Sequence, residues 1–200
     1  MLYKDLADSL DIENMVCSVY LQEEIDVIQK GVDSQEFQEF PDVKRITQLY
    51  LNSIKKYQQQ GPYFLCGESF GGIIALEVAR ELISQGDEVK LVAMLDTNVP
   101  GFTDRLSTWH KAIIHLNSGG IRSLSAKILA RLANKDNKPK REKNATNSAI
   151  SDDEFADVRG YFRKKAIDNY VIEPYDNSVV LFRATKRSEF EPKQVDLGWG

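Results

Sequence analysis

Histidine and cysteine are scarce in this chain, and long apolar runs are missing. Its 200 residues include two cysteines, Cys17 and Cys66, and two histidines, His110 and His115. Both cysteines stand in apolar runs, so we expect buried, reduced thiols rather than a disulfide or a metal site. No run approaches the length of a membrane span and no secretion signal opens the chain. We therefore expect no membrane association and a cytoplasmic location.

Basic residues are fewer than acidic ones. Lysine and arginine number 26 against 30 aspartates and glutamates, and the formal net charge of -4 argues against a nucleic-acid partner. The hydrophobic share of 42% and the charged share of 28% are ordinary for a globular protein. The length suits one domain with a substantial core, so we expect a single domain over residues 1–200.

The most informative stretch is a G-x-S-x-G motif formed by Gly67, Ser69 and Gly71. A short apolar run precedes the motif, and an apolar stripe at helical spacing follows it. This context predicts a nucleophile elbow, in which the serine occupies a strained turn between a strand and a helix. The backbones approach closely at such a turn, which favours small residues beside the serine. Gly67, Gly71 and Gly72 meet that demand.

A second polar residue ends the next expected strand. Residues 89–95 are nearly all apolar, as in a central parallel strand, and Asp96 follows them. Residues 63–95 thus predict a strand-helix-strand unit, and ligands of such sheets bind at the carboxyl ends of the strands. Ser69 and Asp96 both lie there, which makes Asp96 a candidate triad acid. The alternative is that Asp96 only caps the following turn.

Outside residues 63–95, the expected strands and helices alternate less regularly. We expect helices at 2–10, 43–57 and 152–170, strands at 15–20 and 178–184, a surface connection over 22–40, and a helical excursion over about 103–165. The excursion contains a polar, lysine-rich stretch at 134–148, for which we expect a loop.

The run from Gly61 to Gly72, followed by 75–79 and 95–97, resembles the type I thioesterase domains that end nonribosomal peptide and polyketide synthetases. The resemblance covers essentially all 200 residues. It implies an α/β-hydrolase core with a mostly parallel sheet and a helical lid at about 103–165. It further implies that Ser69 accepts the acyl chain, that Asp96 is the triad acid, and that the Phe70 backbone N–H is an oxyanion donor.

The same resemblance implies a substrate and a partner. The acyl or peptidyl group arrives on the phosphopantetheine of a carrier protein, and no cofactor or metal is bound. The lid would cover the acyl chain, with Trp109 and Ile113 either toward the pocket or in the packing of the lid. Residues 135–143 either contact an acidic carrier protein or form a solvated loop.

The resemblance also predicts a core that is incomplete at both ends. Members of the family carry a strand and a glycine-containing loop before the opening helix, and a catalytic histidine beyond a Gly-Trp pair that resembles Gly198-Trp199. His110 or His115 could substitute, but both stand in the expected lid. We therefore expect weak or no activity from this chain. The alternatives are another serine hydrolase, such as an esterase or acyltransferase, or a non-catalytic remnant that binds an acyl chain or a carrier protein.

Overall fold

The structure is a computed structural model that describes residues 2–10, 15–100, 152–168, 170–186 and 194–200. The expectations for the lid between 103 and 151 lie outside the described residues. They include Trp109, Ile113, both histidines and the lysine-rich loop.

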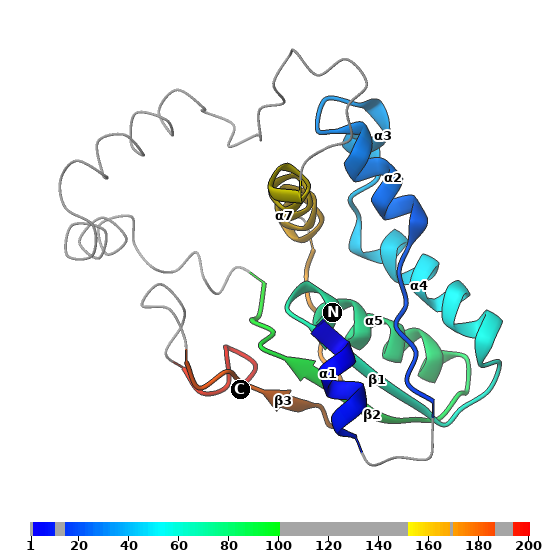
Figure 1. The fold of residues 1–200 in the computed structure, drawn as a ribbon. Helices are drawn as coiled ribbons and strands as arrows, with labels where there is room; N and C mark the ends of the chain where they lie inside the picture. Colours follow the sequence, from blue (N-terminus) through cyan, green and yellow to red (C-terminus); the bar gives the residue numbers. More distant parts are fainter. Residues whose placement is uncertain (1, 11–14, 101–151, 169, 187–193) are drawn as a thin grey trace.

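A small parallel sheet with flanking helices forms the described part of the chain (Figure 1). Its strands pair in the order β1-β2-β3, and both pairings are parallel. The described elements are α1 (Leu2–Ser9), α2 (Gln22–Lys30), α3 (Gln35–Glu39), α4 (Val43–Tyr57), β1 (Tyr63–Glu68), α5 (Phe70–Ser84), β2 (Val89–Leu95), α7 (Asp152–Asp168) and β3 (Val180–Phe182). The expected α/β class with a parallel sheet is confirmed.

Local sequence signals set the ends of the two helices before and after β1. The Asp42 side chain accepts a hydrogen bond from the Arg45 amide (3.1 Å) and so caps α4. After α5, Gly86 adopts a positive φ of 86° and its amide bonds to the Ile83 carbonyl (2.9 Å). That left-handed conformation costs glycine little, so the chain turns there toward β2.

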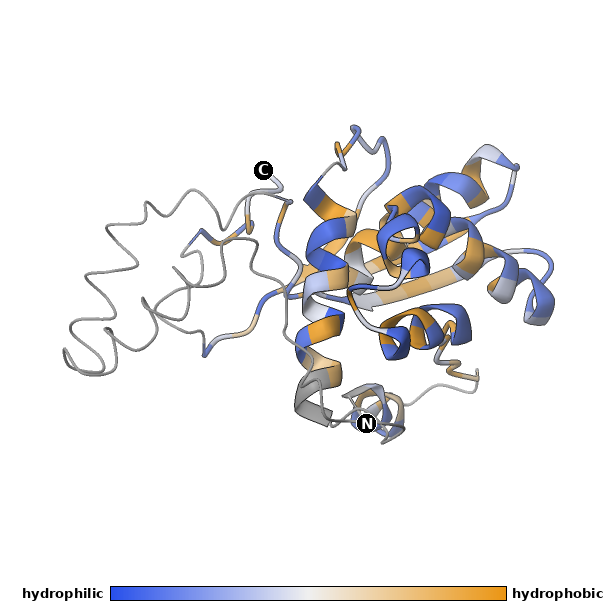
Figure 2. Cartoon of the chain, turned by 90° about the horizontal axis from the view of Figure 1, so that it is seen from above, coloured by the Kyte–Doolittle hydropathy of each residue, from blue (hydrophilic) through white to orange (hydrophobic). Residues whose placement is uncertain are grey.

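Two apolar clusters hold the helices and the sheet together. The larger one joins α2, α3, α4, α5 and α7, and its centre includes Phe37, Ile46 and Phe162, each fully buried. The smaller one lies between α5 and β2, around Ala79, Val92 and Met94. Figure 2 shows hydrophobic colour along the strands and alternating colour along the helices. Helix α5 contributes residues to both clusters, Ile74 to the larger one and Ala79 to the smaller one.

The prediction for residues 15–40 was wrong in two places. The expected strand at 15–20 has no strand partner among the described residues, and Met15 and Tyr20 are 83% and 58% exposed. A β-prone segment without an edge to pair with gains no ladder hydrogen bonds. The expected surface connection at 22–40 instead contains α2 and α3, because its few apolar side chains are buried against α7. Phe37, for example, lies edge-on to Phe162 (5.6 Å between ring centroids).

Both cysteines are exposed, which corrects the expectation of buried thiols. Cys66 shares a face of β1 with Phe64, which is 67% exposed. An apolar run predicts a strand buried on both faces, but burial depends on what covers each face, and Phe64 and Cys66 remain exposed on this one. Strand β3 is also shorter than the expected 178–184.

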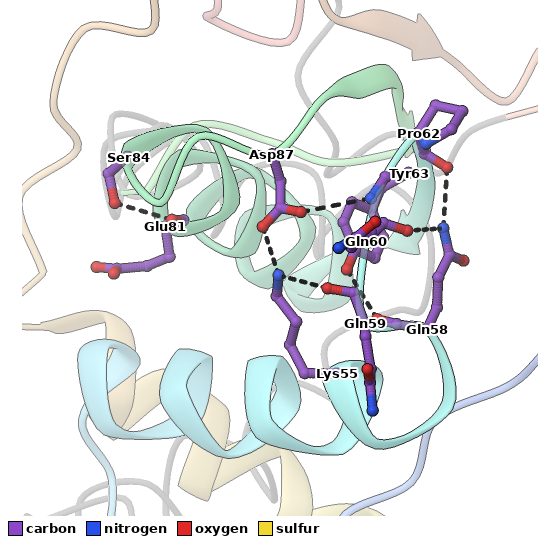
Figure 3. A network of polar contacts seen from close by, with 10 residues as sticks. Lys55, Gln58, Gln59, Gln60, Pro62, Tyr63, Glu81, Ser84 and Asp87 are labelled. Atoms are coloured by element: carbon purple, nitrogen blue, oxygen red, sulfur yellow. Dashed lines mark hydrogen bonds and ion pairs between the residues drawn. The ribbon is translucent and has the colours of Figure 1, made fainter.

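A network of polar contacts joins the loops at the amino-terminal ends of β1 and β2 (Figure 3). Asp87 forms an ion pair with Lys55 and accepts a hydrogen bond from the Gly61 amide (3.4 Å). Lys55 also donates to the Gln59 carbonyl (3.1 Å), and the Tyr63 hydroxyl donates to the Gln58 carbonyl (2.7 Å). The network fixes the entry into β1 at the end of the sheet opposite Ser69.

We predict that Asp87→Ala lowers the melting temperature more than Glu88→Ala. Asp87 is only 12% exposed and serves two partners, whereas Glu88 pairs with Lys90 at the surface with more than half of each side chain exposed. Exposed ion pairs contribute little to stability. Thermal unfolding followed by circular dichroism measures both changes, and equal shifts would show that the network does not hold the loops.

Candidate active site

Ser69 lies on a sharp turn between β1 and α5, as the motif predicts. Its φ of 53° and ψ of -118° are unusual for a residue with a side chain, and the residue is exposed. The turn is held by two backbone bonds, from the Ser69 amide to the Leu95 carbonyl (2.9 Å) and from the Gly72 amide to the Ser69 carbonyl (3.0 Å). Such strained conformations persist only where the surroundings enforce them, and they cluster at functional sites.

Two of the three glycines beside Ser69 are sterically required. A Cβ at Gly67 would overlap the Gly71 carbonyl oxygen, so strand and helix could not approach as they do. A Cβ at Gly72 would lie 2.9 Å from Cβ and 3.0 Å from Cγ2 of Thr97. Gly71 differs, since the nearest atom to an added Cβ would be the Tyr3 hydroxyl oxygen at 3.8 Å, which is an ordinary contact distance. The close approach therefore explains Gly67 and Gly72 but not Gly71.

Asp96 occupies the matching position at the end of β2. Glu68 pairs with Leu95 in the parallel ladder, so Ser69 and Asp96 are the next residues on neighbouring strands. Adjacent strands lie about 4.8 Å apart. Asp96 also has a positive φ, 48°, and its amide donates to the Phe182 carbonyl (2.7 Å). Its Oδ1 accepts from the Ala184 amide (3.2 Å), so the carboxylate is anchored across the sheet beyond β3.

Phe70 begins α5, directly after Ser69. Because it is the first residue of the helix, its N–H has no acceptor within the helix and lies at the positive end of the helix dipole. Its ring is buried, and the guanidinium carbon of Arg163 lies 5.7 Å from the ring centroid. The Phe70 amide is thus suited in principle to an anionic oxygen at this end of the sheet.

Tyr3 is a neighbour of the elbow that the residue pattern did not reveal. Its hydroxyl accepts a hydrogen bond from the Glu68 amide (3.1 Å). Burial raises the pKa of Tyr3, which keeps the phenol neutral at physiological pH. The spacing of leucines predicted the helix but not this contact.

A buried carboxylate lies in the same region. Glu24 on α2 is 7% exposed, and burial raises its pKa, although Arg163 and Arg159 pull in the opposite direction. Burial also raises the pKa of its neighbour Tyr50, with a further rise from the Glu24 charge. Side chains of α2, α4 and α7 therefore meet in a polar group within the larger apolar cluster. No sequence signal indicated this group.

Within the described ranges, no group of three or more histidine, cysteine or acidic side chains is placed to hold a metal ion. Nor does any helix of the described part have the length and apolar character needed to cross a membrane. Both histidines lie among residues 101–151, so the described residues contain no imidazole beside Ser69.

Comparison with protein families matches residues 2–112 to the model of the thioesterase domain. Among curated relatives, an inactive atromentin synthetase of Paxillus involutus is 36% identical over 88 residues, or 44% of this chain and 9% of that protein. The bikaverin polyketide synthase of Gibberella fujikuroi is 44% identical over 55 residues, or 28% of this chain and 3% of that protein. The chain thus spans less than a tenth of the length of these relatives.

Solved structures that match the chain include the NocB thioesterase domain in a covalent complex with a fluorophosphonate nocardicin G analogue. It is 22% identical, with a TM-score of 0.44, over 72% of this chain and 53% of that chain. The RedJ thioesterase of Streptomyces coelicolor is 14% identical, with a TM-score of 0.37, over 72% of this chain and 50% of that chain.

We predict that Gly72→Ala destabilises the protein by roughly 1–3 kcal/mol, because the added methyl group is forced against Thr97. Gly71→Ala is the matched control. It adds the same group one position earlier in α5, where there is room, and a helical alanine is about 0.5–1 kcal/mol better than glycine. Urea unfolding measures both, and equal effects would contradict the close packing at the elbow.

We predict that Glu24→Gln stabilises the protein at neutral pH. Because burial raises the pKa of Glu24 in the folded state, the wild type loses stability as the pH rises from the unfolded-state pKa of about 4.3 to the folded-state value. Below that pH window Glu24 is protonated in both the folded and the unfolded state, so the free energies of unfolding of the variant and the wild type converge. Glutamine has no proton to lose.

Denaturant unfolding across about pH 4 to 7 measures the difference, with the exposed neighbour Glu23→Gln as control. A pH profile of Glu24→Gln that parallels the wild type would contradict the prediction.

Proposed function

Because the chain belongs to the thioesterase domain family, we propose that it serves the release of acyl or peptidyl chains from the phosphopantetheine thioester of a carrier protein. The observation that supports this most is the exposed Ser69 on a left-handed turn, one strand away from Asp96. Within the described residues no histidine lies beside the serine, and we propose that the chain by itself has weak activity or none.

The proposed reaction has two steps. The Ser69 oxygen attacks the thioester carbonyl carbon, a C–O bond forms, the C–S bond breaks, and the hydroxyl proton passes through a base to the leaving thiolate. Water, or a nucleophile within the acyl chain, then attacks the acyl-serine. Its proton returns through the same base to the serine oxygen, and the free acid or cyclic product leaves. A serine hydroxyl is a weak nucleophile without such a base.

Phe70 and Asp96 have separate roles in this scheme. The Phe70 amide donates to the oxyanion of the tetrahedral intermediate, where a preorganised N–H is worth about 10²–10³ in rate. Asp96 holds an imidazole in the tautomer that accepts the serine proton and stabilises its charged form. Anchorage by the Ala184 amide suits Asp96 for this task, because it limits rotation of the carboxylate.

Other parts of the proposal concern the lid, of which only residues 152–165 are described, and molecules that the structure does not contain. We propose that the chain is one domain with a lid at about 103–165 over the acyl chain, and that an acyl or peptidyl carrier protein is the partner. The substrate would bring its own phosphopantetheine, and no bound cofactor is required. The cytoplasmic location stays a prediction.

We predict that imidazole in solution accelerates the reaction of Ser69 with a fluorophosphonate, because it can enter beside Asp96 and act as a base. Intact-mass spectrometry measures the labelling rate with and without imidazole. Ser69→Ala should abolish labelling. Asp96→Asn should reduce the imidazole-dependent rate by about 10²-fold or more, since loss of the triad acid alone can cost about 10⁴.

Asp96→Asn keeps an oxygen that can accept from the Ala184 amide, so the fold should persist. Asp168→Asn, which alters an exposed carboxylate at the end of α7, is the matched control and should label like the wild type. Labelling that imidazole does not accelerate would contradict a catalytic site and favour a non-catalytic binding role.

The same preparation separates a thioesterase from another serine hydrolase. With imidazole present, an acyl N-acetylcysteamine thioester and the matching oxygen ester are compared as substrates. Preferential cleavage of the thioester is expected, whereas a preference for the plain ester would favour an esterase.

A further inference from the structure

The last described segment, residues 194–200, is a compact turn with its own hydrogen bonds. The Asp196 carboxylate accepts from the amides of Gly198 (3.1 Å) and Gly200 (3.2 Å), and the Asp196 carbonyl accepts from the Trp199 amide (2.9 Å). Leu197 and Gly198 both have positive φ values, 52° and 89°. The conformation is thus defined locally, and it fixes the direction of the two side chains at positions 197 and 199.

Those two residues bind the turn to the segment that follows β2. Leu197 is fully buried, and its carbonyl accepts from the Val99 amide (3.1 Å). The Trp199 indole N–H donates to the Thr97 carbonyl (2.8 Å), and the ring packs against the smaller apolar cluster. A partly buried indole generally needs an acceptor for its N–H, and here that acceptor is the backbone of the residue after Asp96.

Thr97 connects Trp199 to the turn at Ser69 and to Asp96. It is fully buried, its hydroxyl donates to the Leu95 carbonyl (3.3 Å), and its side chain fills the space beside Gly72. The amide of Asp96 is thus bonded to the Phe182 carbonyl. The next residue, Thr97, lies against Gly72 and accepts the indole hydrogen bond of Trp199. The positive φ of Asp96, 48°, is a strained conformation, which such restraints on both sides can maintain.

We propose that Trp199 is a positioning residue for Asp96 and acts through the Thr97 carbonyl. The indole bond keeps the chain after Asp96 in place, so that the carboxylate stays aligned with the end of β3 and with the imidazole site beside Ser69. The catalytic part of this inference rests on the proposed function. The structural part, restraint of Asp96 by the indole, does not.

The test is Trp199→Phe in the same chain, which removes the N–H and retains an aromatic ring in the apolar cluster. Amide hydrogen exchange reports the restraint without any activity. We expect exchange at Asp96 and Ala184 to be roughly three- to tenfold faster, the size expected for loss of one hydrogen bond. The Tyr63 amide, bonded to the Glu88 carbonyl at the other end of β1, should be unchanged.

Val179→Ala is the matched control, because Val179 packs against the same cluster and its side chain donates no hydrogen bond. Unchanged exchange at Asp96 and Ala184 in Trp199→Phe would overturn the proposal. Equal acceleration by Val179→Ala would also overturn it, since packing rather than the indole bond would then be the cause.

The catalytic part is tested by labelling of Ser69. We expect Trp199→Phe to reduce the imidazole-dependent rate three- to tenfold, to leave the imidazole-independent rate unchanged, and to have no further effect in an Asp96→Asn background. An equal loss in that background would refute action through Asp96. Absence of imidazole acceleration in the wild type would refute the proposed function instead, and hydrogen exchange would still decide whether Trp199 restrains Asp96.

Discussion

The parallel pairing of β1 with β2 is the constraint on which the candidate site depends. Its register sets Glu68 opposite Leu95, so that Ser69 and Asp96 leave the sheet side by side. The bond from the Ser69 amide to the Leu95 carbonyl extends this ladder into the turn. Because successive strand residues face opposite sides, a slip of one residue would separate the two side chains. The chemistry proposed for Ser69 and Asp96 is therefore a consequence of register.

The two ends of the sheet have different physical characters. At the amino-terminal end, Lys55 and Asp87 join loops through ordinary polar contacts. At the carboxyl end, two residues with side chains adopt left-handed conformations. Gly67 allows two backbone segments to approach closely there, and Gly72 leaves room for the Thr97 side chain. Strain at one end is tolerable because the rest of the sheet and its two apolar clusters are well packed.

Predictions succeeded where the signal was local and failed where burial depended on distant partners. The bounds of α4, the limits of β2 and the turn at Ser69 follow from short patterns, and all three are present. The segment 15–20 has strand-like composition but no strand partner among the described residues, and Cys66 on β1 is exposed. Strand propensity describes what fits a sheet, not whether a neighbour exists.

The sequence by itself determined the elbow, the helix after it and the place of Asp96 at the end of an apolar strand, because strand and helix periods act over a few residues. Only the tertiary structure decided what restrains them. The contact between Ala184 and Asp96 joins residues 88 positions apart, and that between Trp199 and Thr97 joins residues 102 apart. No local pattern encodes such a separation, since these residues are brought together only by the tertiary fold.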